Sequence, residues 1–239
     1  MGDELWQSFE SDWQRFTGAF NGLAVFERTQ ASRGGFAALL LNNGVPAAFV
    51  KARKDNRGPL TSEFDALEAM GRVGSRSFQF PRAVAIGGRE QWHYLLTTAI
   101  DSGLHRVPST PPLEHILEEI RFGLRSLPRH EQTPEDWEPI HGDFTPWNLR
   151  QGAGKALFLV DWEEAGWGPP GADEVYYLAV SKALGAKCDI PDNEDARRFW
   201  IESLETRQTS DETGKPRDHE LSRQLLRALM ERSPEPPGI

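Results

Sequence analysis

The sequence has a single cysteine, no long apolar run and no surplus of positive charge. Cys188 has no partner within the chain, which excludes an internal disulfide and a cysteine-rich zinc site. No stretch reaches the roughly 18 apolar residues that a membrane span requires, and the N-terminal segment does not show the basic and then apolar order of a secretory signal. We therefore expect a soluble, cytoplasmic protein with no membrane partner.

The net charge of the chain bears on whether it binds nucleic acid. The chain has 27 basic and 36 acidic residues, a formal net charge of −9, and a negatively charged protein is repelled by a phosphate backbone. We therefore expect no nucleic-acid partner. The 239 residues, of which 38% are hydrophobic, are enough to bury a substantial core in one large domain or two smaller lobes.

The first 98 residues predict a mostly antiparallel sheet with one inserted helix. An amphipathic helix with aromatic residues on one face comes first, and Asn42-Asn43-Gly44 is a typical hairpin turn. The inserted helix is expected at 62–73, with Thr61 or Ser62 as its N-cap. Gly87-Gly88 predicts the turn of a second hairpin. The expected strands cover 22–27, 36–41, 47–51, 81–86 and 92–98.

The remaining residues predict a mostly helical region. The stretch 99–112 contains a glycine and three prolines and is the expected boundary between two lobes, 1–98 and 99–239. The polar stretch 205–220 predicts a loop. Helices are expected at 111–127, 174–185, 194–204 and 221–232.

The strongest chemical signal is a polar loop followed by an apolar run. Asp143 and Asn148, five residues apart, lie on the loop, and Asp161 ends a strand-like run 13 residues further on. One carboxylate can take a proton from a substrate hydroxyl, while a carboxylate and an amide oxygen can ligate a hard cation such as Mg²⁺. The three side chains together therefore suit phosphoryl transfer.

These residues also carry a family resemblance. His141-Gly142-Asp143, the asparagine five positions later and the strand that ends in Asp161 resemble the signature of the aminoglycoside phosphotransferase and choline kinase-like family, distant relatives of protein kinases. The resemblance implies an α+β, two-lobed protein kinase-like fold, with an N-terminal antiparallel sheet with one helix and a mostly helical C-terminal lobe. It implies that Asp143 is the catalytic base, and that Asn148 and Asp161 are ligands of Mg²⁺ bound to ATP or GTP.

The same resemblance implies a strand lysine that holds the α- and β-phosphates and a glutamate that orients it. Lys51 ends a strand-like run, and Glu63 opens the following helix 12 residues later, so we predict that the two form an ion pair. Lys54 is a nearby alternative to Lys51. The N-terminal lobe is then the nucleotide-binding lobe, and the C-terminal lobe is the catalytic and substrate-binding lobe.

Two further segments are expected to meet the nucleotide. The stretch 95–100 occupies the position of the family's hinge, whose backbone groups bind the adenine edge, and the expected binding residues are Leu95, Thr97 and Thr98. Residues 28–36 are expected to cover the phosphates. This segment has two adjacent glycines but no complete Gly-x-Gly-x-x-Gly motif, so Ser32 or Arg33 is a candidate to assist.

Two departures from protein kinases favour a small acceptor. Gly142 stands where protein kinases carry the arginine that reads a phosphorylated activation loop, and Asp173 follows Asp161 by only 12 positions, too few for a peptide-docking segment. We therefore expect Mg²⁺-dependent transfer of the γ-phosphate of ATP to a hydroxyl of a small molecule: an aminoglycoside, another antibiotic, a sugar or an amino alcohol. The missing glycine motif leaves an inactive nucleotide-binding module as an alternative, and a protein-modifying kinase is a third hypothesis.

Several other polar and aromatic residues have both a structural and a functional interpretation. His141 is expected to brace the metal-binding strand rather than to move protons. Glu163 is either solvated or, two residues after Asp161, in contact with a metal or the substrate. Asp173 is expected to be a helix N-cap that also ties down the catalytic loop. Three tryptophans are expected to pack in the core or to form a substrate wall: Trp147, Trp162 and Trp167.

Overall fold

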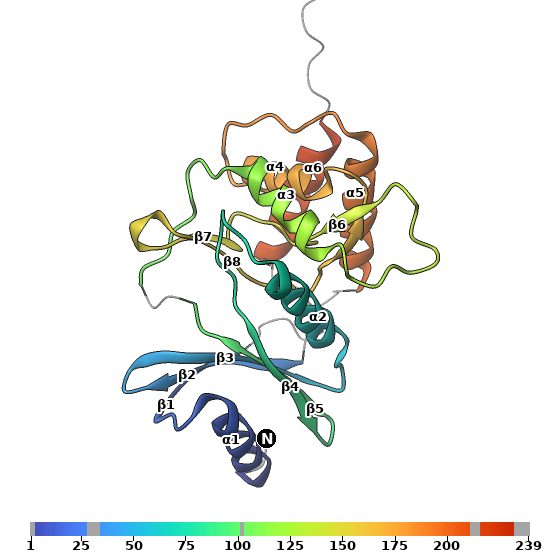
Figure 1. The fold of residues 1–239 in the computed structure, drawn as a ribbon. Coiled ribbons are helices and arrows are strands. Elements are labelled where there is room, and N and C mark those ends of the chain that lie inside the picture. The colour runs from blue at the N-terminus through green and yellow to red at the C-terminus, as the bar shows by residue number, and fades with distance from the viewer. Residues whose placement is uncertain (1–2, 28–33, 101–102, 211–215, 232–239) are drawn as a thin grey trace, which may run out of the picture.

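The computed structural model describes residues 3–27, 34–100, 103–210 and 216–231. In this part of the chain a sheet and a group of helices lie on either side of helix α2 (Gly58–Val73), as Figure 1 shows. None of the described helices is both long and apolar enough to span a membrane. The expected α+β architecture, with a sheet first and helices afterwards, is confirmed.

A five-stranded antiparallel sheet forms the N-terminal region, and all five expected strands are present. The strands are β1 (Gly22–Glu27), β2 (Gly35–Asn42), β3 (Val45–Lys54), β4 (Ala83–Arg89) and β5 (Trp92–Thr98). They pair in the order β1-β2-β3-β5-β4. Helix α1 (Asp3–Thr17) packs on this sheet through Phe9 and Trp13, which are fully buried.

The two hairpin turns differ in how well the sequence predicts them. Between β2 and β3, Asn43 and Gly44 have the positive φ values, 50° and 78°, that a tight hairpin turn needs, so this prediction is confirmed. The turn predicted at Gly87-Gly88 is wrong, because both glycines lie within β4 and the turn follows at Glu90, with φ 53°. A Cβ atom at either glycine would lie 2.6 Å from a side-chain atom of β5, so these glycines provide space rather than a turn.

Helix α2 begins four residues earlier than expected. Its N-cap is Arg57, and the predicted capping by Thr61 or Ser62 is wrong, because no side chain caps this helix. Pro59 lies in the first turn, where its restricted φ suits the helix and its missing N–H has no consequence. The early start places Glu63 in the second turn, on the buried side of the helix.

The C-terminal region is mostly helical, with short strands between its helices. The helices are α3 (Leu113–Leu124), α4 (Ala172–Ala183), α5 (Glu194–Ser210) and α6 (Pro216–Met230), and the strands are β6 (Glu138–Ile140), β7 (Leu149–Gln151), β8 (Leu157–Leu159) and β9 (Gly166–Gly168). The loop predicted at 205–220 is wrong over most of its length, because α5 continues to Ser210 and α6 begins at Pro216. Glutamate, arginine and glutamine are good helix formers, so a polar composition does not by itself indicate a loop.

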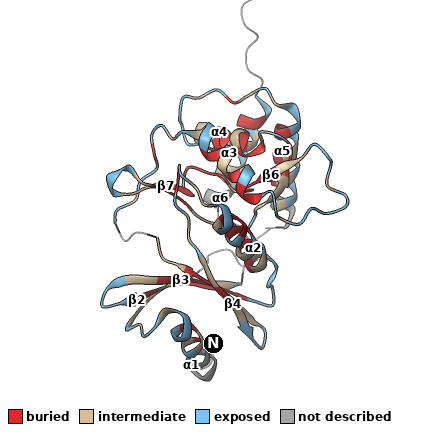
Figure 2. Cartoon of the chain, viewed as in Figure 1, coloured by how far each residue is buried: buried red, intermediate tan, exposed pale blue. Residues whose placement is uncertain are grey.

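Three buried clusters hold these elements together (Figure 2). One lies between α1 and the sheet, and another lies among α4, α5 and α6. The third joins the two regions, since Leu67 of α2 and Ile120 of α3 share a cluster with Phe144 and Trp162. Helix α2 and the polar segments around these two aromatic residues are therefore held at fixed positions by one core. The division into lobes after residue 98, where β5 ends, stays a prediction.

Candidate active site

A cavity of about 760 Å³ opens between the sheet and the loops of the C-terminal region. Its volume is in the range of cofactor and small-molecule sites. The two walls of this cavity differ in chemistry. The wall from the sheet, called the sheet wall below, is apolar and consists of Phe26, Ala37, Leu39, Pro46 and Phe49. The opposite wall, called the polar wall, contains His105, Trp147, Asn148, Arg150, Val160 and Asp161.

The loop between β6 and β7 carries the predicted catalytic motif, and hydrogen bonds to Asp173 hold this loop in place. Its carboxylate accepts hydrogen bonds from the backbone N–H groups of His141 at 2.6 Å and Gly142 at 3.1 Å. Gly142 has φ 78°, and a Cβ atom there would lie 2.0 Å from the carbonyl oxygen of Glu164, so the turn requires glycine. The predicted N-cap role of Asp173 is wrong, because Gly171 is the N-cap of α4, whereas its predicted role in tying down the loop is confirmed.

Asp143 and Asn148 are in direct contact. The amide Nδ2 of Asn148 donates to the backbone carbonyl oxygen of Asp143 at 2.9 Å and to its carboxylate Oδ2 at 2.8 Å. Both amide protons are thus used, which leaves Oδ1 as the amide atom able to bind a cation. Burial, together with the charge of Asp161, raises the pKa of Asp143 to about 7. Its carboxyl group can therefore gain and lose a proton near neutral pH.

Asp161 lies just beyond the strand that was predicted to carry it. Strand β8 ends at Leu159, and the backbone N–H of Val160 donates to the carbonyl oxygen of Asn148 at 3.1 Å. Asp161 has φ 69°, a left-handed conformation that is uncommon for a residue with a side chain. Its Oδ1 accepts a hydrogen bond from Lys51 Nζ at 2.5 Å. The structure thus brings the two predicted metal-binding residues to the same wall of the cavity.

Lys51 connects β3, helix α2 and the segment after β8. Its Nζ lies 2.8 Å from Oε1 and 2.6 Å from Oε2 of Glu63, so the predicted contact between these two residues is present. Burial alone would lower the pKa of Lys51, but the negative charges of Glu63 and Asp161 outweigh it and raise the pKa. The ammonium group is therefore held in its charged form at the cavity. Lys54 is exposed and does not line the cavity, which favours Lys51 of the two candidates.

The predicted hinge residues differ in their relation to the cavity. Thr97 and Thr98 line it. Leu95 is fully buried opposite Lys51 in the register of β3 and β5, and its side chain is not part of the cavity wall. The hinge role of these three residues stays a prediction.

The predicted phosphate-covering segment, 28–36, is described only in part. Residues 28–33, which include Ser32 and Arg33, lie outside the described residues. Gly35 begins β2 with φ 152°, and a Cβ atom there would lie 2.0 Å from a carbonyl oxygen of β3. Glycine at this position therefore allows the two strands to approach each other closely at the end of the hairpin where β2 begins.

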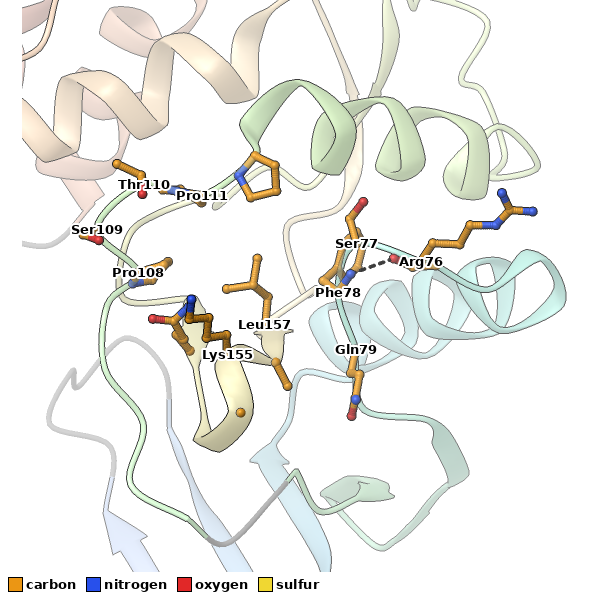
Figure 3. A pocket seen from close by; sticks show the side chains of 15 residues that line it. Arg76, Ser77, Phe78, Gln79, Pro108, Ser109, Thr110, Pro111, Lys155 and Leu157 are labelled. Carbon is orange, nitrogen blue, oxygen red and sulfur yellow. Dashed lines mark hydrogen bonds between the residues drawn. The ribbon is translucent and has the colours of Figure 1, made fainter.

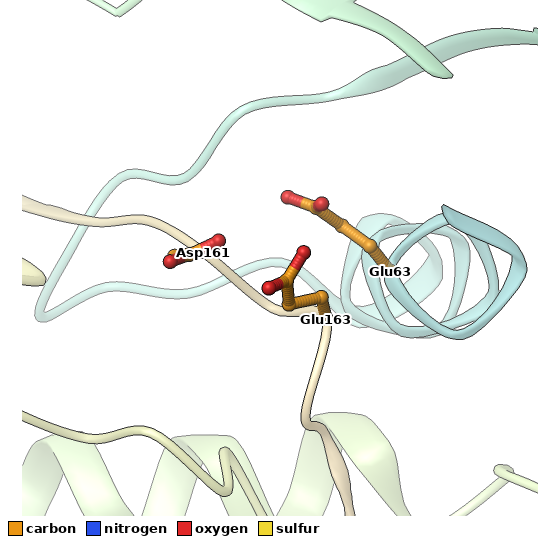
Figure 4. A group of neighbouring side chains, drawn as sticks. All are labelled: Glu63, Asp161 and Glu163. Atoms are coloured by element: carbon orange, nitrogen blue, oxygen red, sulfur yellow. The ribbon is translucent and has the colours of Figure 1, made fainter. Parts of the chain in front are cut away.

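Three carboxylates, Glu63, Asp161 and Glu163, lie close together beside helix α2 (Figure 4). Ligand atoms of Glu63, Asp161 and Glu163 lie within 4.8 Å of one another. Two cations pair with these three carboxylates, because Lys51 bonds to Glu63 and Asp161, and Arg53 Nη2 lies 2.6 Å from Glu163 Oε2. Burial alone would raise the pKa of Glu163, but the charges of Lys51 and Arg53 outweigh it and lower the pKa. The predicted solvation of Glu163 is therefore wrong, since the carboxylate is paired and buried.

The oxygen donors of the polar wall fit a hard divalent cation. Asn148 and Asp161 present an amide and a carboxylate to the same cavity, and these ligand types, with phosphate oxygens and water, are those that Mg²⁺ prefers. Glu163 does not line the cavity and is bonded to Arg53. The residues present therefore fit magnesium, with Asn148 and Asp161 as its candidate ligands.

His141 has the geometry expected of a structural histidine. It is fully buried, and its Nδ1 accepts a hydrogen bond from the backbone N–H of Asp143 at 3.3 Å. Burial lowers the pKa of His141 to about 4. The ring is therefore neutral at physiological pH and supports the loop from inside the core.

The three tryptophans near the motif have three different surroundings. Trp162 is fully buried in the cluster shared by α2 and α3. Trp147 lines the cavity and is the candidate for a substrate wall. Trp167 donates from Nε1 to the carbonyl oxygen of Pro128 at 3.1 Å, outside the cavity.

Three residues at or near the cavity were not predicted from the sequence: Arg53, His105 and Arg150. Arg53 follows Lys51 by two positions, and Arg150 follows Asn148 by two positions. Because side chains two apart share one face of a strand, this period is a signal that could have identified Arg53, which lies on β3 with Lys51, whereas Asn148 precedes β7 and gives no such signal for Arg150. No comparable signal points to His105, which lies on an irregular segment and lines the polar wall.

A second cavity, of about 550 Å³, lies apart from these residues (Figure 3). It is bounded by the linker 75–79 after α2, by residues 108–112 before α3 and by the hairpin of β7 and β8. None of the predicted site residues lines it. Glu119 of α3 accepts hydrogen bonds from the backbone of the linker at 3.0 and 3.1 Å, so the polar groups at this edge are used to fix the linker.

Solved structures of known proteins share this fold. The chain is similar to the GDP and kanamycin complex of the phosphotransferase APH(2")-IIia, with 14% identity, a TM-score of 0.59 and coverage of 94% of this chain and 97% of that chain. It is also similar to a putative fructosamine-3-kinase from Haemophilus somnus, with 13% identity, a TM-score of 0.56 and coverage of 95% and 98%. For the aminoglycoside phosphotransferase APH(3'')-Id from Streptomyces rimosus, the identity is 15% and the TM-score is 0.51, and the similarity covers 96% of this chain and 99% of that chain. A search among curated proteins found no match.

These similarities define the class as the two-lobed, protein kinase-like phosphotransferase fold, which confirms the expected fold. The sequence model of the phosphotransferase enzyme family matches residues 64–192, more than half of the chain. The chain therefore belongs to this family, as the resemblance implied. The match includes Asp143, Asn148 and Asp161, whereas Lys51 precedes it.

Proposed function

We propose that this protein transfers the γ-phosphate of ATP or GTP to a hydroxyl group of a small molecule. The observation that carries the proposal is the convergence of Lys51, Asn148 and Asp161 on one cavity, together with the hydrogen bond that joins Asn148 to Asp143. The membership of the chain in the phosphotransferase enzyme family supports this chemistry. Phosphoryl transfer depends mainly on positioning and charge stabilisation, which such a set of side chains can provide.

Asp143 is the proposed catalytic base. A pKa of about 7 allows its carboxylate to accept the proton of the acceptor hydroxyl near neutral pH. The hydrogen bond from Asn148 orients this carboxylate, and the two hydrogen bonds to Asp173 hold the loop that carries it. Asn148 and Asp173 therefore fix the position of the proposed base relative to the acceptor hydroxyl.

The nucleotide is proposed to lie in the cavity between the sheet wall and the polar wall. Lys51, oriented by Glu63, is the proposed ligand of its phosphates, and Asn148 and Asp161 are the proposed ligands of magnesium. Magnesium, when bound, supplies positive charge that offsets the charge of the triphosphate. The hinge residues named above are proposed to contact the base, which makes 1–98 the nucleotide-binding lobe and 99–239 the catalytic and substrate-binding lobe.

The acceptor is proposed to be a hydroxylated small molecule such as an aminoglycoside, another antibiotic, a sugar or an amino alcohol. Related solved structures are named as complexes with kanamycin and GDP and with hygromycin B and ADP, which supports a purine nucleotide and a hydroxylated acceptor. A cytoplasmic location fits this proposal, because nucleoside triphosphates are available there.

A pair of isosteric variants tests the proposed roles. Asp143→Asn should lower turnover by about 10²–10⁴-fold, the usual contribution of a general base, while nucleotide binding stays nearly unchanged. Asp161→Asn should instead weaken binding of the nucleotide in the presence of Mg²⁺, because one proposed metal ligand loses its charge. Turnover is measured as Mg²⁺-dependent gain of one phosphate by mass across a panel of aminoglycosides, sugars and amino alcohols, and binding by calorimetry with a non-hydrolysable ATP analogue.

Asp65→Asn is the matched control, because Asp65 is an exposed carboxylate on α2 that does not line the cavity. Equal turnover in the wild type and both site variants would contradict the proposal. Nucleotide binding without transfer to any acceptor in the panel would instead identify an inactive nucleotide-binding module, and phosphate found only on protein would identify a protein kinase.

A further inference from the structure

The pair formed by Arg53 and Glu163 is a second link between the same two segments that Lys51 and Asp161 connect. Lys51 and Arg53 are two residues apart on β3, and Asp161 and Glu163 are two residues apart after β8. Lys51 Nζ lies 2.5 Å from Asp161 Oδ1, and Arg53 Nη2 lies 2.6 Å from Glu163 Oε2. The two ion pairs therefore stand side by side and hold the segment 161–163 on the sheet.

The two pairs differ in their access to ligands. Lys51 and Asp161 line the cavity, and the Asp161 side chain is 35% exposed. Arg53 and Glu163 do not line the cavity, and each side chain is only 4% exposed. A ligand in the cavity can therefore compete for the first pair but cannot reach the second.

The charges of this network explain why one ion pair should be open to ligands and the other closed to them. Three carboxylates, Glu63, Asp161 and Glu163, face two cations, Lys51 and Arg53, within one network. If the phosphates of a nucleotide bind Lys51 and a cation binds Asp161, the contact between these two residues is weakened by both ligands. The segment would then lose its first link to β3 at the moment when Asp161 has to be positioned.

We propose that the Arg53–Glu163 pair is a positioning strut, which holds residues 160–163 on β3 while Lys51 and Asp161 exchange their mutual contact for nucleotide and cation. A buried ion pair contributes little net stability compared with apolar residues of similar size, so a positional role gives a reason for burying these charges. Glu163 is then not a cation ligand, although it lies close to Glu63 and Asp161. The part of this inference that concerns ligands rests on the proposed function, whereas the link between the segments does not.

The test uses the double variant Arg53→Met/Glu163→Leu, in which both charges are removed and the space stays filled, so that the chain is expected to fold. Arg53→Lys is the conservative variant. Arg53 contacts Glu163 through Nη2, while its Nε has no hydrogen-bond partner among the described residues, so one ammonium group can replace the contact. The matched control is Arg89→Met/Asp12→Leu, which removes a partly exposed pair between β4 and α1 at 3.1 Å.

The first measurement is hydrogen exchange of the amides of residues 160–165 without nucleotide. In the double variant these amides should exchange at least about tenfold faster than in the wild type, because the segment opens locally more often. Exchange in α4 should stay unchanged, and Arg53→Lys and the control pair should behave like the wild type in residues 160–165. Wild-type exchange in the double variant would overturn the proposal, whether or not the protein binds nucleotides.

The second measurement is the Mg²⁺ concentration at which binding of a non-hydrolysable ATP analogue is half-saturated. The double variant should need about 10–100 times more Mg²⁺, the usual effect of removing a group that orients a metal ligand, and Arg53→Lys should restore most of this affinity. Weaker Mg²⁺ binding with wild-type hydrogen exchange would identify Glu163 as a metal ligand and overturn the strut. Faster exchange in a protein whose wild type binds no nucleotide would refute the proposed function and leave the strut intact.

Discussion

The sheet wall and the polar wall of the cavity are built by different means. The side chains of the sheet wall, such as Leu39 and Phe49, project from strands whose positions depend on backbone hydrogen bonds between β1, β2, β3 and β5. Two side chains of the polar wall are held by bonds to side chains outside it, since Asn148 bonds to Asp143 and Asp161 bonds to Lys51 of β3. A change on the sheet wall should therefore remove contact area, whereas a change on the polar wall should disturb its neighbours as well.

Apart from the loss of the proposed base, the largest effect is expected for Lys51→Met, which removes the cation of β3 that bonds to Asp161 of the polar wall. The substitution removes the cation shared by Glu63 and Asp161 and the proposed phosphate ligand, so kcat/KM should fall by about 10²–10³-fold, as for other charge-stabilising donors. Steady-state kinetics with a responsive acceptor measures this effect. Lys54→Met is the control, because Lys54 is exposed and outside the cavity. A greater loss in Lys54→Met than in Lys51→Met would reverse the assignment of the two lysines.

A pH-dependent loss of stability is expected from His141, which supports the polar wall from the core. Its folded pKa of about 4 lies below the value of about 6.5 in an unfolded chain, so the unfolded state takes up the proton first as the pH falls. The neutral His141 ring therefore costs no folding stability above about pH 6.5, whereas the free energy of unfolding should fall by about 2 kcal/mol between there and pH 5. Urea unfolding at pH 7 and pH 5 measures the free energy of unfolding.

His141→Gln should remove this difference between the two pH values, because glutamine does not titrate and can still accept a hydrogen bond from Asp143. His115→Gln, at an exposed position on α3, should retain it. The same pH dependence in wild type and His141→Gln would show that other groups destabilise the protein at low pH.

A smaller effect, confined to binding, is expected for Phe49→Ala on the sheet wall. Loss of an aromatic surface that faces the cavity should raise KM for the nucleotide by about tenfold, while kcat stays nearly constant. Val45→Ala is a control on the same strand, because Val45 is exposed and does not line the cavity. A fall in kcat larger than the rise in KM would mean that the two walls are not functionally separate.

The smallest effect is expected for Arg150→Met, which changes a charged group of the polar wall that forms no ion pair with a described side chain. Within the described residues, no ion pair includes Arg150, and its side chain lines the cavity. A contact of its guanidinium group with the nucleotide should contribute about threefold to affinity. Calorimetry with ADP measures the difference, and Arg150→Lys tests whether the charge is sufficient. An effect as large as that of Lys51→Met would show that Arg150 belongs to the mutually bonded network.

Much of the fold could be predicted because it depends on local patterns. The strands follow from apolar runs separated by turn residues, and the turn at Asn43-Gly44 follows from the positive φ values that these residues tolerate. The predictions that failed involve residues with more than one role. Gly87 indicated a turn, but it lies within β4, where a glycine is needed because Tyr94 of the neighbouring strand leaves no room for a side chain. The end of α5 is polar and still helical.

In the candidate site, the contacts within one loop could be predicted from the sequence, whereas the contacts between distant segments could not. Asp143 and Asn148 are five residues apart, so their contact lies within one loop and their spacing indicates it. The pairing of Arg53 with Glu163 spans 110 residues of chain, and no local pattern specifies it. Leu95 is fully buried and does not line the cavity, and this depends on tertiary packing, which a strand period does not describe.

The amino-acid sequence alone determined the strands, the loop that carries Asp143 and the family to which the chain belongs, because these depend on residue types at short spacings. The tertiary structure decided which cation meets which carboxylate, and which of these pairs is open to a ligand. The physical reason is that the strength of a charge pair depends on distance and burial, and both arise only when β3, α2 and the segment after β8 pack together.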